Sequence, residues 1–201
     1  MADPAARGVG LVLLSGGAAR AAEWVRRGVV PCHVGEHPAW TMVTPASAVT
    51  AAAAPYDDAL TLLASRHVGP RQSPTIGLFV IDDAAVITAQ AAGWRTVRRW
   101  ALRGVEREVR PGPELPALRP QDLHRVLASA APQRRIRLAE ITDLWRRTDL
   151  TQREWLVEAA QVLGLPGARV LSGQDPAPGP RIDPDPRAVG AFETVVKDVQ
   201  P

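Results

Sequence analysis

The first part of the chain alternates between continuous apolar runs and segments in which apolar residues have helical spacing. Residues 9–14 form an apolar run that is typical of a buried strand. Residues 18–27 have helical spacing, and two arginines followed by Gly28 predict the end of that helix. Residues 29–34 and 40–44 then predict two strands joined by a polar turn.

The pattern then repeats a helix followed by strands. Residues 55–67 predict a second helix, because a proline lies in its first turn and Gly69 follows its end. Two apolar runs flank Asp82 and Asp83, which predicts a hairpin. A stretch rich in Trp and Arg then predicts a third strand, and a further segment pairs with it. The expected strands are residues 75–81, 84–89, 94–103 and 105–110.

The resulting order is strand, helix, strand, strand, helix, strand, with further strands appended. This order predicts an α+β fold of the ferredoxin-like β-α-β-β-α-β type, in which two helices cover one face of an antiparallel sheet. A three-layer α/β sheet is the alternative. We expect this sandwich domain to span residues 1–113.

The second part of the chain is helical and ends in a tail. Residues 121–131, 138–147 and 151–163 predict three helices, the last of which begins with a capping box formed by Thr151 and Glu154. We therefore expect a helical region over residues 114–172. Residues 173–201 predict a tail that is mobile or extended through its Pro-rich part and carries a short apolar element, residues 188–199, that docks on its own domain or on a partner.

Composition narrows the protein class. The chain has 201 residues, Arg supplies all but one of its 24 basic residues, and its single cysteine excludes an internal disulfide. That bias toward Arg is typical of a GC-rich, bacterial-type genome.

No apolar run is long enough to cross a membrane, and the N-terminal run is too short for a signal peptide, so we expect a cytoplasmic protein. Residues 95–147 contain thirteen Arg and only six acidic residues, which makes the middle of the chain basic.

The Trp- and Arg-rich stretch at 94–103 is the first candidate binding site. Aromatic and basic side chains on an exposed sheet bind single-stranded nucleic acids in several folds. On a strand, however, Trp94 and Trp100 share a face with Leu102, which favours tryptophans packed in the core and arginines solvated on the opposite face. The candidate binding residues are Arg95, Arg98, Arg99, Trp100 and Arg103.

Ser15, Gly16 and Gly17 are a candidate anion-binding site, because they join a strand to a helix whose first backbone amides are free to bind an anion. The chain lacks the glycine fingerprint of dinucleotide-binding proteins and the P-loop motif. A tight turn in which glycine lets helix and strand pack closely explains the three residues equally simply, and is the interpretation we favour.

Cys32, His33, Glu36 and His37 are the densest group of nucleophilic or metal-ligating residue types. Cys32 and His33 are adjacent, so on a strand they point to opposite faces and do not share an ion or a proton. We therefore predict no metal site, no catalytic residue and no cofactor.

These observations favour a non-catalytic regulatory or accessory protein that acts through contacts with a protein partner or with copies of itself. The alternative is a nucleic-acid-binding protein that uses residues 95–147. A second alternative is an enzyme with a pocket near His33 and His37.

Overall fold

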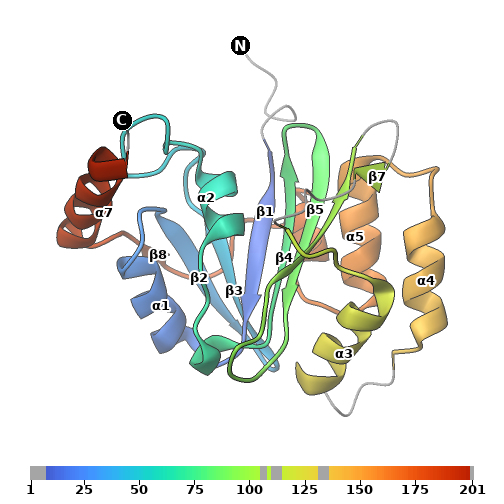
Figure 1. Cartoon of the computed structure of the whole chain (residues 1–201). Helices are drawn as coiled ribbons and strands as arrows, with labels where there is room; N and C mark the ends of the chain where they lie inside the picture. The colour runs from blue at the N-terminus through green and yellow to red at the C-terminus, as the bar shows by residue number, and fades with distance from the viewer. Residues whose placement is uncertain (1–7, 105–107, 110–114, 131–135, 200–201) are drawn as a thin grey trace.

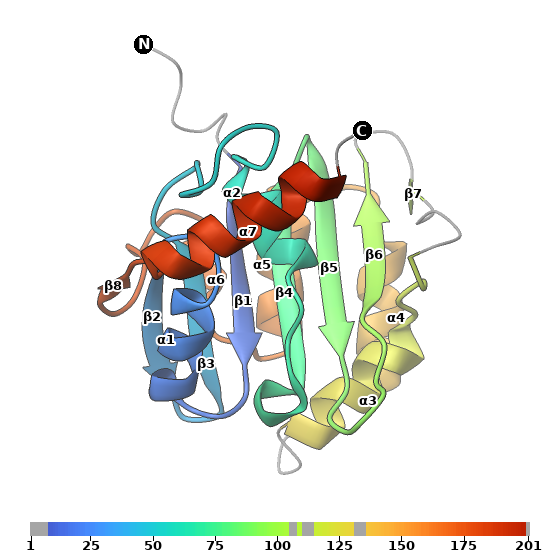
Figure 2. The same cartoon turned by 60° about the vertical axis from the view of Figure 1, so that its left-hand side comes forward.

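The computed structural model describes residues 8–104, 108–109, 115–130 and 136–199 and shows a mixed α+β fold, as the sequence predicts. One open antiparallel sheet runs through the molecule, and helices lie on both of its faces (Figures 1 and 2). Among the described residues, no helix combines the length and the apolar composition that crossing a membrane requires.

The sheet contains eight strands among the described residues, and neighbouring strands are antiparallel throughout. Their order across the sheet is β7-β6-β5-β4-β1-β3-β2-β8. The strands are β1 (Gly10–Leu14), β2 (Cys32–His37), β3 (Trp40–Pro45), β4 (Thr75–Ile81), β5 (Ala84–Gln90), β6 (Arg99–Arg103), β7 (Glu108–Val109) and β8 (Arg181–Ile182).

The helices form two layers. The first layer covers one face of the sheet, and the second layer covers the other (Figure 2). The first layer consists of α1 (Ala18–Arg26), α2 (Ala59–Ser65) and α7 (Pro186–Val199). The second layer consists of α3 (Pro120–Ala130), α4 (Leu138–Arg146), α5 (Gln152–Val162) and α6 (Ala168–Leu171).

The central strand β1 explains why both faces are covered. All five of its residues are buried. Leu11 and Leu13 belong to the hydrophobic core beneath α3 to α6. Val12 and Leu14 belong to a second core beneath α1 and α2. We expected helices on one face of the sheet only, and this expectation is wrong. A strand that is apolar at every position needs cover on both faces, and the helices of the region 114–172 supply the second layer.

Several local predictions are confirmed. Asp82 and Asp83 both have positive φ angles, 46° and 58°, and form the two-residue turn between β4 and β5. The Thr151 hydroxyl accepts a hydrogen bond from the Glu154 amide, and the Glu154 carboxylate accepts one from the Thr151 amide, so α5 begins with the predicted capping box.

The strand predicted for residues 94–103 is wrong in its first half, because β6 begins only at Arg99. Gly93 and Arg95 have φ angles of 122° and 62°, which turn the backbone away from a strand. Residues 91–98, which we call the Trp94 loop, therefore project from the end of β5. The segment expected at 105–110 lies partly outside the described residues; its described part, β7, pairs with β6.

Residues 174–185, which we call the C-terminal strap, lie along the outer edge of β2 and connect the two helical layers. The Val34 amide donates to the Pro180 carbonyl oxygen, and β8 pairs with the first two residues of β2. Helix α7 then docks on its own chain: Phe192 makes an edge-to-face contact with Tyr56 at 5.5 Å between ring centres. The strap is thus extended, and the apolar element that follows it is a helix packed on the first layer.

Candidate functional site

The five candidate binding residues at 95–103 do not form one surface, because β6 sends alternate side chains to opposite faces. Arg98 is mostly buried beside α2, where its two terminal nitrogens donate to the carbonyl oxygens of Ala64 and Arg66, each at 2.5 Å. Burial lowers the pKa of Arg98 to about 10. Trp100 packs partly buried against the same core. Both side chains therefore help to hold the fold together.

Arg99 and Arg103 point to the other face, which is covered by helices and not solvated as we expected. Arg99 lies 3.7 Å from the Asp122 carboxylate of α3. The guanidinium of Arg103 lies over the Trp155 ring of α5, 5.3 Å from its centre. Partial burial lowers the pKa of Arg103. The arginines on this face thus contact the second helical layer.

Trp94 is the largest departure from the expected packing. It was expected in the core, but it lies in the Trp94 loop and 83% of its surface is exposed. The Arg95 guanidinium lies 5.3 Å from the centre of its ring. Val97, two residues after Arg95 in the chain, is 59% exposed. The loop therefore displays an aromatic, a cationic and an aliphatic side chain together.

A hollow of about 260 Å³ lies between the Trp94 loop, the end of β5 and α3. We call it the arginine hollow, because three arginines line it. Its floor is apolar and its walls carry one carboxylate, Asp122. It is lined by Ala89, Ala91, Arg95, Thr96, Val97, Arg99, Leu118, Asp122, Arg125 and Val126.

Asp122 organises two of these three arginines. One of its carboxylate oxygens lies 3.7 Å from Arg99 and 3.3 Å from Arg125, and the other accepts a hydrogen bond from the Arg119 amide at the start of α3. Its side chain is only 15% exposed, whereas that of Arg125 is 72% exposed. The carboxylate therefore pairs with both guanidinium groups while most of the Arg125 side chain remains in solvent.

Sequence reasoning identified Arg95 and Arg99 but missed three residues of this surface. Val97 was assigned to a strand face, and Asp122 and Arg125 belong to a helix whose docking site the sequence does not reveal. The available signal was the acid and base three residues apart near a helix start, a spacing that places them side by side.

At the candidate anion site formed by Ser15, Gly16 and Gly17, a side chain of the protein already binds the first amide of the following helix. The first amide of α1, that of Ala18, donates to the Glu36 carboxylate at 3.2 Å. The Ser15 hydroxyl turns away and donates to the Ser73 carbonyl oxygen at 2.6 Å. A hollow of about 510 Å³ borders the two glycines, and Glu36 and His37 also line it. A carboxylate of the chain thus occupies the position in which an anion would bind.

Cys32 and His33 face opposite sides of β2, as their adjacency predicts. Cys32 is fully buried, and burial raises the pKa of its thiol to about 12, although the nearby Arg66 lowers it in part. The His33 ring nitrogen Nδ1 lies 3.2 Å from the Gly179 carbonyl oxygen of the C-terminal strap. Within the described residues, no group of three or more His, Cys, Asp or Glu side chains is placed to hold a metal ion.

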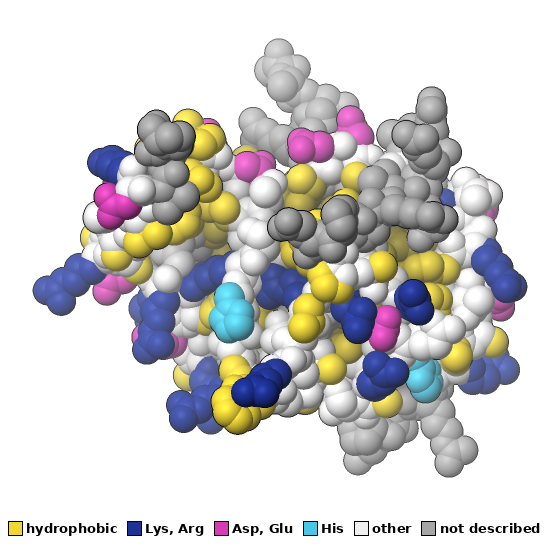
Figure 3. Space-filling model, viewed as in Figure 1, with side chains coloured by type: hydrophobic (Ala, Val, Ile, Leu, Met, Phe, Trp, Pro, Cys, Tyr) yellow, Lys and Arg dark blue, Asp and Glu magenta, His cyan; other side chains and the backbone are white. Residues whose placement is uncertain are grey.

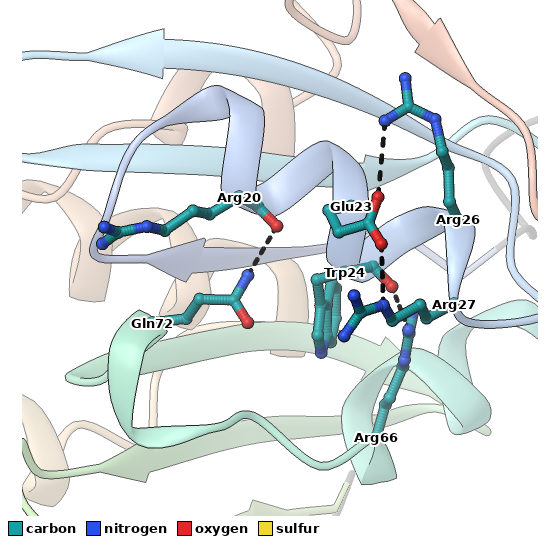
Figure 4. Close-up of polar contacts among 7 residues, drawn as sticks. All are labelled: Arg20, Glu23, Trp24, Arg26, Arg27, Arg66 and Gln72. Atoms are coloured by element: carbon teal, nitrogen blue, oxygen red, sulfur yellow. Dashed lines mark hydrogen bonds and ion pairs between the residues drawn. The ribbon is translucent and has the colours of Figure 1, made fainter.

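A second group of basic side chains lies around α1 (Figure 4). The Arg66 guanidinium stacks on the Trp24 ring, 4.1 Å from its centre, and donates to the Trp24 carbonyl oxygen. Burial lowers the pKa of Arg66 to about 10. Glu23 lies between Arg26 and Arg27 and forms ion pairs with both. These contacts fasten α1 to the end of α2, whereas the Arg20 guanidinium points away from them (Figure 4).

Five of the nine described arginines of the basic segment 95–147 form ion pairs with Asp or Glu. They lie on β6, on α3, and in α4 or directly beside its ends. They are Arg99, Arg125, Arg137, Arg146 and Arg147. Figure 3 shows the basic side chains of one face in separate groups, interrupted by apolar and uncharged surface. The positive charge of the basic segment is therefore divided among separate groups of side chains.

Comparisons with known proteins give no relative to set beside this geometry. A scan against models of protein families, a search of curated proteins and a search of solved structures found no match to this chain.

Proposed function

We propose that this protein is a non-catalytic regulatory or accessory protein that binds another protein through the Trp94 loop. The observation that carries the proposal is the exposure of Trp94, a large apolar side chain with 83% of its surface in water. Trp and Arg dominate the binding energy of protein interfaces, and here they stand stacked on one another. A second copy of the chain is an alternative partner for the same surface.

The loop that carries Trp94 is braced from both sides. The Gln90 side chain donates to the Thr96 hydroxyl at 3.4 Å, and that hydroxyl donates to the Gly93 carbonyl oxygen at 3.5 Å. Beyond Val97, the two short hydrogen bonds of Arg98 fix the chain to α2. A loop held in this way loses little conformational freedom when a partner binds, which favours affinity.

The two alternative functions receive less support. A nucleic-acid-binding protein needs a continuous series of free cations that contact phosphates. Five arginines of the segment 95–147 are instead paired with acids, and Arg98 is mostly buried. An enzyme built around His33 needs a nucleophile or a metal, and the neighbouring thiol is buried with a raised pKa.

We further propose a ferredoxin-like origin for the central part of the fold and a cytoplasmic, bacterial-type setting. The strand order β4-β1-β3-β2, with α1 and α2 on one face, supports the first. A single, buried, unpaired cysteine supports the cytoplasmic setting, and the predominance of Arg among the basic residues supports the bacterial-type one.

The test of the proposed function is capture of the partner from extracts of the source cells by wild-type protein, W94A and V49A. Val49 is a matched control, because it is also exposed and follows β3, whose end lies at the opposite side of the sheet from the end of β5. We expect W94A to recover about tenfold less partner, as truncation of an interface anchor does. V49A should recover the wild-type amount. Equal recovery by W94A and wild type would contradict the proposal.

A further inference from the structure

We infer that the partner inserts an acidic side chain, with an apolar residue beside it, into the arginine hollow. This inference rests on the proposed function, because it names the chemistry of the partner that the Trp94 loop binds. The hollow adjoins the loop directly: Arg95, which stacks on Trp94, is one of its lining residues, and so is Val97.

The charges at the hollow favour an anion. Three arginines and one aspartate line the hollow, so its lining carries excess positive charge. Each guanidinium has five N–H donors, and Arg125 uses one terminal nitrogen on Asp122 while most of its side chain is exposed. The donors that remain have the forked geometry that pairs with a carboxylate through two parallel hydrogen bonds.

The floor of the hollow favours a peptide. Ala89, Leu118 and Val126 are core residues that reach its surface, so an apolar side chain finds contacts there that a free anion does not use. Its volume of about 260 Å³ lies below the 300–1,000 Å³ that is typical of pockets for small-molecule ligands. One or two side chains of a partner are the occupants that match this size and this mixture of surfaces.

A carboxylate fits better than the phosphates of a nucleic acid. Asp122 lines the hollow and repels any anion that enters; a protein partner needs to bring only one carboxylate, whereas a nucleic acid brings a series of phosphates, each with one negative charge. Among the described residues, no continuous series of free cations leads away from the hollow, since Arg98, which directly precedes β6, is mostly buried. The structure therefore favours an acidic peptide segment over a nucleic acid.

The probe for this inference is a phage library of random dodecapeptides selected on the immobilised full-length protein. The strongest binder is then synthesised with a fluorescent label, together with a version in which Asn and Gln replace its Asp and Glu. Affinities are measured for wild type, R125Q, R95Q, W94A and R146Q. Arg146 is the matched control, because it is an exposed arginine in a surface ion pair that does not line the hollow.

We expect the selected peptides to carry Asp or Glu beside an apolar residue. R125Q, R95Q and the amide version of the peptide should each weaken binding about tenfold or more, as loss of a charged hydrogen bond does, and R146Q should leave it unchanged. R125Q is at a mostly exposed position, so its unfolding midpoint should match that of wild type.

Other outcomes overturn the inference in distinguishable ways. Peptides that require Trp94 but carry no acidic residue and are insensitive to R125Q would overturn it while the proposed function stands. Peptides that bind W94A as well as wild type, or a selection without enrichment, would overturn both. Displacement of the peptide by a single-stranded DNA 20-mer, with binding of that DNA weakened by R125Q, would assign the hollow to nucleic acid.

Discussion

Arg98 and Arg99 are neighbours in the chain, but their guanidinium groups reach opposite faces of the sheet. Arg98 is mostly buried and donates to two carbonyl oxygens near the end of α2, whereas Arg99 stands at the arginine hollow. In a sequence that is rich in Arg, the sequence alone does not distinguish the buried arginine from the one at the hollow. Only the position of the first strand residue, Arg99, decides which of them is available to a partner.

Replacement of Arg98 by Met should therefore affect stability. Met keeps much of the apolar stem but leaves the carbonyl oxygens of Ala64 and Arg66 without their donors, so we expect the free energy of unfolding to fall by about 2–4 kcal/mol. Urea unfolding followed by tryptophan fluorescence measures this change. The matched variant R95M, at an exposed position, should stay within about 0.5 kcal/mol of wild type. An R98M protein as stable as R95M would contradict the structural role.

Cys32 gives a prediction about pH. Burial raises the pKa of its thiol in the folded protein to about 12 from a usual value of 9.0. The unfolded chain thus releases this proton first, and the contribution of Cys32 to stability is complete below pH 9 and is lost as the pH rises toward 12. Alkylation by iodoacetamide at pH 9.5 should be slow in the folded protein and fast in urea. Equal rates would contradict the buried, protonated thiol; the chain has one cysteine, so the signal has one source.

At the scale of elements, the features that depend on neighbouring residues are predictable from the sequence. The capping box of α5, the Asp82-Asp83 turn and the continuous apolar strand β1 are all local patterns. The loop at 91–98 is not, because an alternation of Trp, Arg and aliphatic residues is compatible with a strand. The positive φ angles at Gly93 and Arg95 prevent this stretch from forming a strand. A positive φ angle is uncommon for a residue other than glycine, so the sequence does not predict it at Arg95.

The C-terminal strap gives a prediction with an internal control. Gly179 has a φ of +79°, and a Cβ atom there would collide with the Val34 carbonyl oxygen of β2. Gly190 lies in α7 with open space around its Cα. We expect G179A to lower the free energy of unfolding by about 1–3 kcal/mol. G190A should raise it by up to about 1 kcal/mol, because Ala favours a helix interior. Urea unfolding midpoints that fall equally for both variants would contradict the close approach of the strap to β2.

At the scale of the whole molecule, the sequence predicts the α+β class, but not how the helices divide between the two faces of the sheet. The sequence indicates a separate helical region over residues 114–172 because each helix has its own apolar stripe, and a stripe does not say which surface it covers. The candidate surface depends on this partition. Asp122 and Arg125 meet Arg95 and Arg99 only because α3 lies against the end of β5, about thirty residues away in the chain.

The C-terminal strap also has a consequence for the behaviour of many molecules together. An open sheet edge exposes unpaired amides to which strands of other chains can add, and such addition leads to aggregation. Here the Val34 amide is already bound to Pro180, and β8 covers Cys32 and His33. The prolines on both sides of β8 have no amide hydrogen to offer to an incoming strand. We therefore expect the Pro-rich segment to prevent strands of other chains from adding to this edge of the sheet and forming oligomers or fibrils.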